Sequence, residues 1–89
     1  MKPYKVVYKD LSSKNVYGYA VYAKKGKPAR IEVDETLKGC RHLETLVHET
    51  IHLVADYLDE VAVTRMGAKI ATQLWASGYR QIADKGPKK

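Results

Sequence analysis

The period of the apolar residues changes after residue 34, and this change constrains the fold more than any other feature of the chain. Before it, residues 4–9, 16–23 and 30–34 are rich in β-branched and aromatic residues or alternate in polarity, which predicts three strands. Polar segments, "DLSSKN" and "KKGKP", separate them. We expect the first two strands to form a hairpin and the sheet to be antiparallel.

After the change, apolar residues recur at helical spacing in two segments, from about 41 to 58 and from about 60 to 79. The residues that carry the pattern are Leu43, Leu46, Val47, Val54 and Leu58 in the first segment and Val63, Met66, Gly67, Ile70 and Leu74 in the second. The predicted order is therefore three strands followed by two helices. The simplest closure is an α+β fold in which the helices cover one face of the sheet.

Length and composition favour a single small domain over residues 1–84, followed by a basic flexible tail at 85–89. The one cysteine, Cys40, excludes an internal disulfide framework and fits a reducing compartment. The N-terminal segment lacks the apolar run of a signal peptide, and no window approaches a membrane span. We therefore expect a cytoplasmic protein without membrane attachment. The net charge of +6 permits an acidic partner without requiring one.

The pentapeptide "HETIH" places His48, Glu49 and His52 in the first predicted helix. Histidines four residues apart lie about 40° apart around a helix and about 6 Å apart along it, so both imidazoles can bind one metal ion. Glu49 then points beside the metal, where a carboxylate can take a proton from a water that zinc activates. This is the HExxH arrangement of metallopeptidases. The alternative is a metal-free surface helix with two half-exposed histidines.

The segment "RIEVDETLKGCRHLETLVHETIHLV" and the helix after it resemble small phage and prophage zincin-like metallopeptidases, related in outline to SprT-like and ImmA/IrrE-type domains. The matching residues within 30–78 are Ile31, Val33, Asp34, Leu37, Thr45, Leu46, His48, Glu49 and His52, then Glu60, Val63, Met66 and Gly67. The resemblance implies a minimal zincin-like fold and a gluzincin-type site. Zinc would be held by His48, His52 and Glu60, with Glu49 as the general base.

Three carboxylates near the end of the first helix are candidates for the third ligand: Asp56, Asp59 and Glu60. In a regular helix Asp56 lies about 12 Å from His48 along the axis, too far to share its metal. Asp59 is a competent N-cap for a new helix, which leaves Glu60 as the preferred ligand and Asp59 as the alternative. A continuous helix would put Glu60 about 18 Å from His48, so the hypothesis requires a turn near Tyr57–Asp59.

Other residues near the motif have plainer interpretations. We interpret His42 as a polar residue of the helix start, Cys40 as a small buried or half-buried side chain, and Tyr57 as a tyrosine packed at the helix end. Asp56 lies either behind the metal ligands or in solvent, and the solvated position is favoured. Gly67 is costly in a helix, and close approach to the histidine helix would explain it.

The function predicted from these residues is peptide hydrolysis by a zinc-dependent metallopeptidase, with a peptide or protein as the substrate. An extended substrate would pair with an edge strand, either 30–34 or 16–23. The alternative is a non-catalytic, zinc-stabilised module that binds a protein or nucleic acid. Basic clusters at 24–30 and 85–89 suggest only weak nucleic-acid binding, because no recognised nucleic-acid motif accompanies them.

Overall fold

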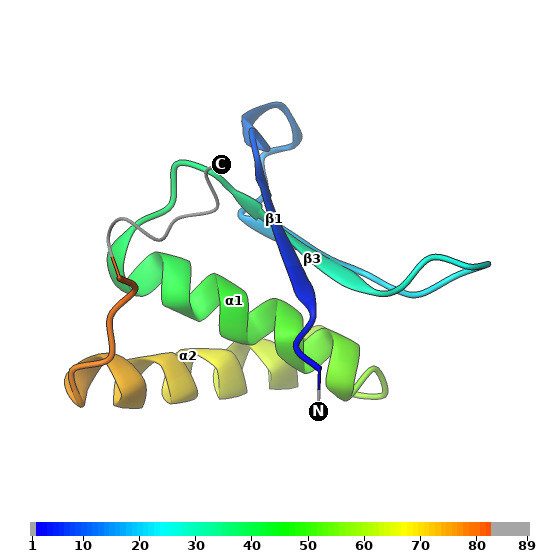
Figure 1. The fold of residues 1–89 in the computed structure, drawn as a ribbon. Coiled ribbons are helices and arrows are strands. Elements are labelled where there is room, and N and C mark those ends of the chain that lie inside the picture. The colour runs from blue at the N-terminus through cyan, green and yellow to red at the C-terminus, as the bar shows by residue number, and fades with distance from the viewer. Residues whose placement is uncertain (1, 83–89) are drawn as a thin grey trace.

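The structure, a computed structural model, describes residues 2–82 and has an α+β architecture (Figure 1). The elements in chain order are β1 (Lys5–Lys9), a short 3-10 helix (Ser12–Lys14), β2 (Gly18–Val21), β3 (Arg30–Asp34), α1 (Gly39–Val54) and α2 (Glu60–Ala76). The predicted order of three strands and two helices is confirmed. The predicted tail at 85–89 lies outside the described residues. Within the described part of the chain, neither helix is long and apolar enough to cross a membrane.

The sheet is mixed, and the prediction of an antiparallel sheet is wrong. Strand β3 lies in the centre, parallel to β1 and antiparallel to β2. The expected hairpin between the first two strands is therefore absent. Alternating polarity shows which face of a strand is buried but does not identify its neighbour. The most buried strand, β3, takes the central place, with Ile31 only 2% and Val33 0% exposed.

The link between β1 and β2 explains why these strands do not pair. Instead of a two-residue hairpin turn, the chain forms a 3-10 helix that ends at Asn15 in a left-handed conformation. Asp34, at the end of β3, accepts a hydrogen bond from the backbone N–H of Leu11 at 2.8 Å. This contact ties the link to the central strand, and β2 then returns along the other edge of β3.

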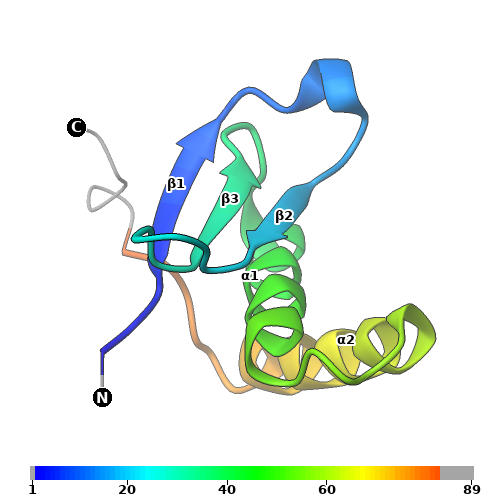
Figure 2. The same cartoon turned by 90° about the vertical axis from the view of Figure 1, so that its right-hand side faces the viewer.

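The molecule has three layers, in which α1 lies between the sheet and α2 (Figures 1 and 2). Helix α1 packs on β2 and β3, and α2 packs on α1. The expectation that both helices cover the sheet is therefore wrong for α2, whose apolar face is buried against α1 instead. Val63 of α2 is fully buried, and Gly67 lets the two helices approach closely. A Cβ atom added at Gly67 would lie 3.4 Å from the Cα of His48, so the expected close approach is confirmed.

The break between the helices is confirmed, although α1 ends at Val54 and not near residue 58. Residues 55–59 form a turn in which the N–H of Leu58 donates to the carbonyl of Ala55 at 3.0 Å. Asp59 then caps α2, since its Oδ1 accepts from the N–H of Ala62 at 2.8 Å. A cap of this kind starts a new helix, which explains why the segment "ADYLD" does not continue α1.

Candidate metal centre

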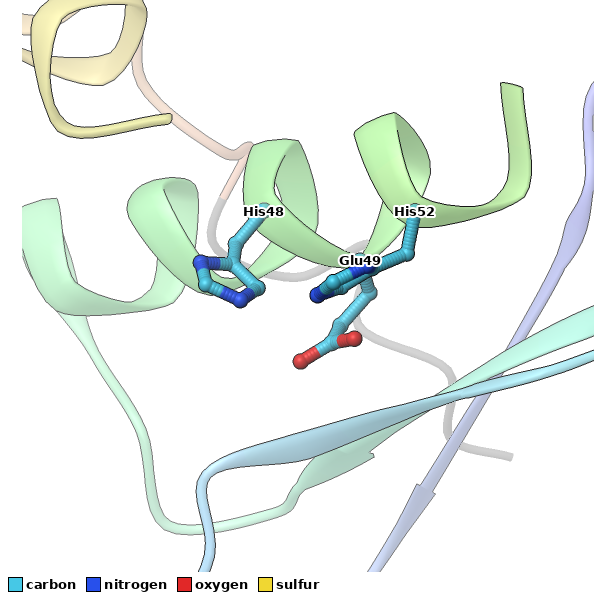
Figure 3. A group of neighbouring side chains, drawn as sticks. All are labelled: His48, Glu49 and His52. Atoms are coloured by element: carbon cyan, nitrogen blue, oxygen red, sulfur yellow. The ribbon is translucent and has the colours of Figure 1, made fainter. Parts of the chain in front are cut away.

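Two histidines of α1 lie side by side on the face that carries Glu49 (Figure 3). The ring centroids of His48 and His52 are 4.9 Å apart, and each side chain is 20% exposed. Their spacing of four residues puts them one above the other on the helix. The rings are therefore half-buried but still reachable from solvent.

The carboxylate of Glu60 bridges these two rings. Its Oε2 lies 3.1 Å from Nε2 of His48, and its Oε1 lies 2.9 Å from Nε2 of His52. Glu60 is the first residue of α2, where the Asp59 cap fixes the start of the helix. The close packing at Gly67 holds α2 against α1, so that the first turn of α2 faces the histidines.

The structure separates the three carboxylates considered as third ligands. Asp56 is exposed in the turn after α1, and Asp59 is engaged as the helix cap. Only Glu60 contacts both histidines. Its side chain is 68% exposed, and an ion pair at that exposure contributes little stability. Stabilisation of the helix pair is therefore a poor explanation for this convergence.

Glu49 lies beside the two histidines on the sheet side of α1. One ligand atom from each of His48, Glu49 and His52 lies within 4.8 Å of the others, a group that could hold a metal ion. Burial raises the pKa of the Glu49 carboxyl, the nearby histidines lower it, and Glu60 raises it further, with a net upward shift. The carboxylate is consequently more basic than an exposed glutamate.

The start of β2 covers Glu49, and a glycine permits the approach. A Cβ atom at Gly18 would lie 2.8 Å from the carbonyl oxygen of Glu32, 2.9 Å from Cγ2 of Thr45 and 3.4 Å from Cγ of Glu49. Further along, the hydroxyl of Tyr22 donates to the carbonyl of His52 at 3.1 Å. Sequence reasoning missed Gly18, although a glycine inside a strand pattern is a known sign of close backbone approach.

An open cleft of about 450 Å³ lies between the start of β2 and α1. Its lining residues are Val16, Tyr17, Gly18, Arg41, Glu44, Thr45, His48, Glu49 and Glu60. The cleft therefore contains the Glu49 carboxylate and two of the three side chains predicted to bind the metal. Sequence reasoning did not identify Tyr17 or Arg41 as members of this cleft.

The remaining candidates lie elsewhere. His42 is buried, and one of its ring nitrogens lies 2.7 Å from the hydroxyl of Tyr8. Cys40 is half-buried, as expected. Tyr57 is 83% exposed, so the interpretation of a packed tyrosine is wrong. The reason is the early end of α1, which places Tyr57 in the turn and away from the helix interface.

Comparison of the chain with protein-family models, with curated proteins and with solved structures yields no match. The family resemblance thus depends on the sequence motif alone.

Proposed function

We propose that this chain is a zinc-dependent metallopeptidase with a minimal zincin-like fold. The observation that carries the proposal is the convergence of the Glu60 carboxylate on Nε2 of both His48 and His52, with Glu49 beside them. Two imidazoles and one carboxylate are a common donor set of catalytic zinc sites, in which one position stays open. The open cleft at these residues supports access for a substrate.

The contacts of Glu60 with the two histidines have lengths compatible with a shared zinc ion. Ligands about 2.0–2.1 Å from zinc at tetrahedral angles lie about 3.3 Å from one another. The two contacts of Glu60 with the histidines, 3.1 and 2.9 Å, are close to this separation. His48, His52 and Glu60 would therefore hold the metal.

The metal-binding side chains and Glu49 then have distinct chemical roles. Zinc, when bound, supplies a Lewis acid that activates water and polarises a peptide carbonyl. Glu49 is the proton acceptor, because its carboxylate lies beside the two histidines and lines the cleft that a substrate would enter. After the attack, the same carboxyl can pass its proton to the departing amine nitrogen.

The sheet offers one edge strand next to these residues. Strand 30–34 is central and paired on both sides, which removes it as a docking edge. Strand β2 is an edge strand and begins over Glu49. An extended peptide that pairs with β2 would lie along the cleft. We therefore propose a peptide or protein substrate, in the reducing setting of the cytoplasm that the single cysteine suggests.

Glu49→Gln tests this function directly. The amide keeps the size of the side chain but cannot accept the proton, so we expect unchanged zinc content and a loss of peptide cleavage of at least about 100-fold. Cleavage is measured by mass spectrometry on a random peptide library with zinc-loaded protein. Glu35→Gln, at an exposed position after β3, is the matched control. Equal cleavage by the wild type and Glu49→Gln would exclude Glu49 as the base.

A second candidate is a non-catalytic module that zinc stabilises. It is favoured by the placement of the donors, since His48 and His52 belong to α1 whereas Glu60 belongs to α2. A metal ion bound by all three would fasten α2 to the rest of the molecule. This candidate predicts stoichiometric zinc, a large loss of stability on chelation and no cleavage of any peptide. Its partner would be a protein, or a nucleic acid at the basic β2–β3 turn.

A further inference from the structure

The cleft extends beyond the metal-binding side chains to a cation that the proposed chemistry does not use. Arg41 lines the cleft from the first turn of α1, and its Cζ lies 4.8 Å from the centre of the Tyr17 ring. The backbone carbonyl of Tyr17 accepts from the N–H of Asp34 at 2.8 Å, so its position is fixed by β3. The Tyr17 ring thus holds the Arg41 guanidinium at one end of the cleft.

Arg41 is poorly suited to its place in the helix. Positive charge in the first turn is unfavourable with the helix dipole, and α1 has no acidic residue in that turn to offset it. Within residues 2–82, no hydrogen bond or ion pair engages the guanidinium. A residue that is unfavourable for its secondary structure but lies in a cleft often has a functional role. The five donors of Arg41 are available to a ligand that enters the cleft.

The distance from Arg41 to the metal-binding side chains can be expressed in residues of an extended peptide. Arg41 precedes His48 by seven residues, about 10 Å along the helix. Strand β2 and the residue after it follow the same course, from Gly18 beside Glu49 to Tyr22 at the carbonyl of His52. An extended chain advances about 3.3 Å per residue, so Arg41 lies about three residues from a bond level with His48.

We propose that Arg41, held against Tyr17, binds a carboxylate of the substrate about three residues from the bond that is cut. The inference rests on the proposed peptidase function and adds the substrate class: extended peptides with one acidic side chain at that position. Glu44 lines the cleft between Arg41 and His48 and repels acids placed nearer the cut bond. The cleft would thus select an acidic side chain at one position of the peptide and not acidic peptides in general.

A positional library tests the preference. The probes are end-blocked random decapeptides in which one position at a time holds Asp or Asn. We measure cleavage by the zinc-loaded wild type and, separately, competition for a fluorescent decapeptide bound to zinc-loaded Glu49→Gln protein. We expect one position at which Asp is preferred over Asn by about tenfold, as for a charge-assisted hydrogen bond near solvent.

Charge variants assign the preference to Arg41. In Arg41→Gln the ratio of Asp to Asn should fall to about one, and in Arg41→Glu it should fall below one, while Arg65→Gln on the outer face of α2 keeps the wild-type ratio. Cleavage with no such position, or with a ratio unchanged in Arg41→Gln, overturns this inference and leaves the peptidase function intact. Binding without cleavage overturns the peptidase function, and the binding ratio then decides the role of Arg41. If no decapeptide is bound or cleaved, both the peptidase function and the role of Arg41 are overturned.

Discussion

Helix α1 carries three histidines in two surroundings. His42, near its start, is buried against Tyr8 of β1, with the two rings stacked at 5.6 Å and burial lowering the pKa of the imidazole. His48 and His52, two to three turns later, are partly exposed and face one carboxylate. One residue type on one helix thus serves as a core side chain at one end and as a potential ligand at the other. The neighbours brought by the fold make the difference, since one end meets the strand β1 and the other meets the cap of α2.

The largest expected effect tests whether metal binds only at His48 and His52 and not at His42. His52→Ala removes a proposed ligand and should weaken zinc binding by more than about 100-fold, since even changes of outer-shell groups can cost about 10–100-fold. His42→Ala should leave the zinc affinity unchanged. Both are measured by competition with a chromophoric chelator. Equal affinities for the two variants would contradict the distinction between the two ends of α1.

Removal of the metal should show the same contrast in stability. Zinc at 100 times its dissociation constant stabilises the native state by about 2.7 kcal/mol, which corresponds to roughly 10–20 °C for a domain of this size. A chelator should therefore lower the melting temperature of the wild type and of His42→Ala by this amount. His52→Ala should melt at the same temperature with and without chelator, as followed by circular dichroism. A wild type that is insensitive to the chelator would exclude a native-state metal.

The next effect separates two adjacent acidic residues at the start of α2. Asp59→Ala removes the cap bond to Ala62 and should cost about 1 kcal/mol of unfolding free energy in metal-free protein. Glu60→Ala should leave the stability of the metal-free protein nearly unchanged, because its contacts are exposed, but should weaken zinc binding markedly. Urea unfolding and zinc titration of both variants make the comparison. Unchanged zinc affinity in Glu60→Ala would remove it from the ligand set.

The smallest expected effect is a pH dependence of stability at the buried end of α1. Because burial lowers the pKa of His42 in the folded protein, the unfolded chain takes up the proton first as the pH falls below about 6.5. The contribution of neutral His42 to stability is present above that pH and is lost as the pH falls through its folded pKa. The Tyr8 hydroxyl contacts this ring, and Lys38, Tyr79 and Arg80 line the cavity beside it.

His42→Gln tests this expectation, since it keeps a hydrogen-bonding partner for Tyr8 but does not titrate in this range. In metal-free protein, the difference in unfolding free energy between the wild type and His42→Gln should fall between pH 7 and pH 5. The other histidines are common to both proteins and cancel in the difference. If the unfolding free energies of the two proteins change in parallel with pH, the fold does not hold His42 neutral.

Local chemistry explains which features the sequence could predict. The strand and helix segments follow from apolar periodicity, and the helix break follows from the capping chemistry of Asp59. Both signals depend only on residues close to one another in the sequence. The strand order could not be predicted, because alternation does not specify which strand pairs with β3. The cleft was missed for a related reason: Arg41 and Tyr17 are 24 residues apart in sequence and meet only after the sheet packs on α1. The burial of His42 likewise depends on a tyrosine 34 residues away.

The short turn between the helices has a consequence for the order of folding. The proposed donor atoms all belong to residues 48–60, so bringing them together closes only a small loop. The parallel pairing of Lys5 with Arg30 spans 25 residues, so it closes a longer loop and is expected to form more slowly. We therefore expect the amide protons of α1 and α2 to become protected from exchange before those of β1. The chain would then gain the ability to hold a metal ion before it has the edge strand needed to hold a peptide.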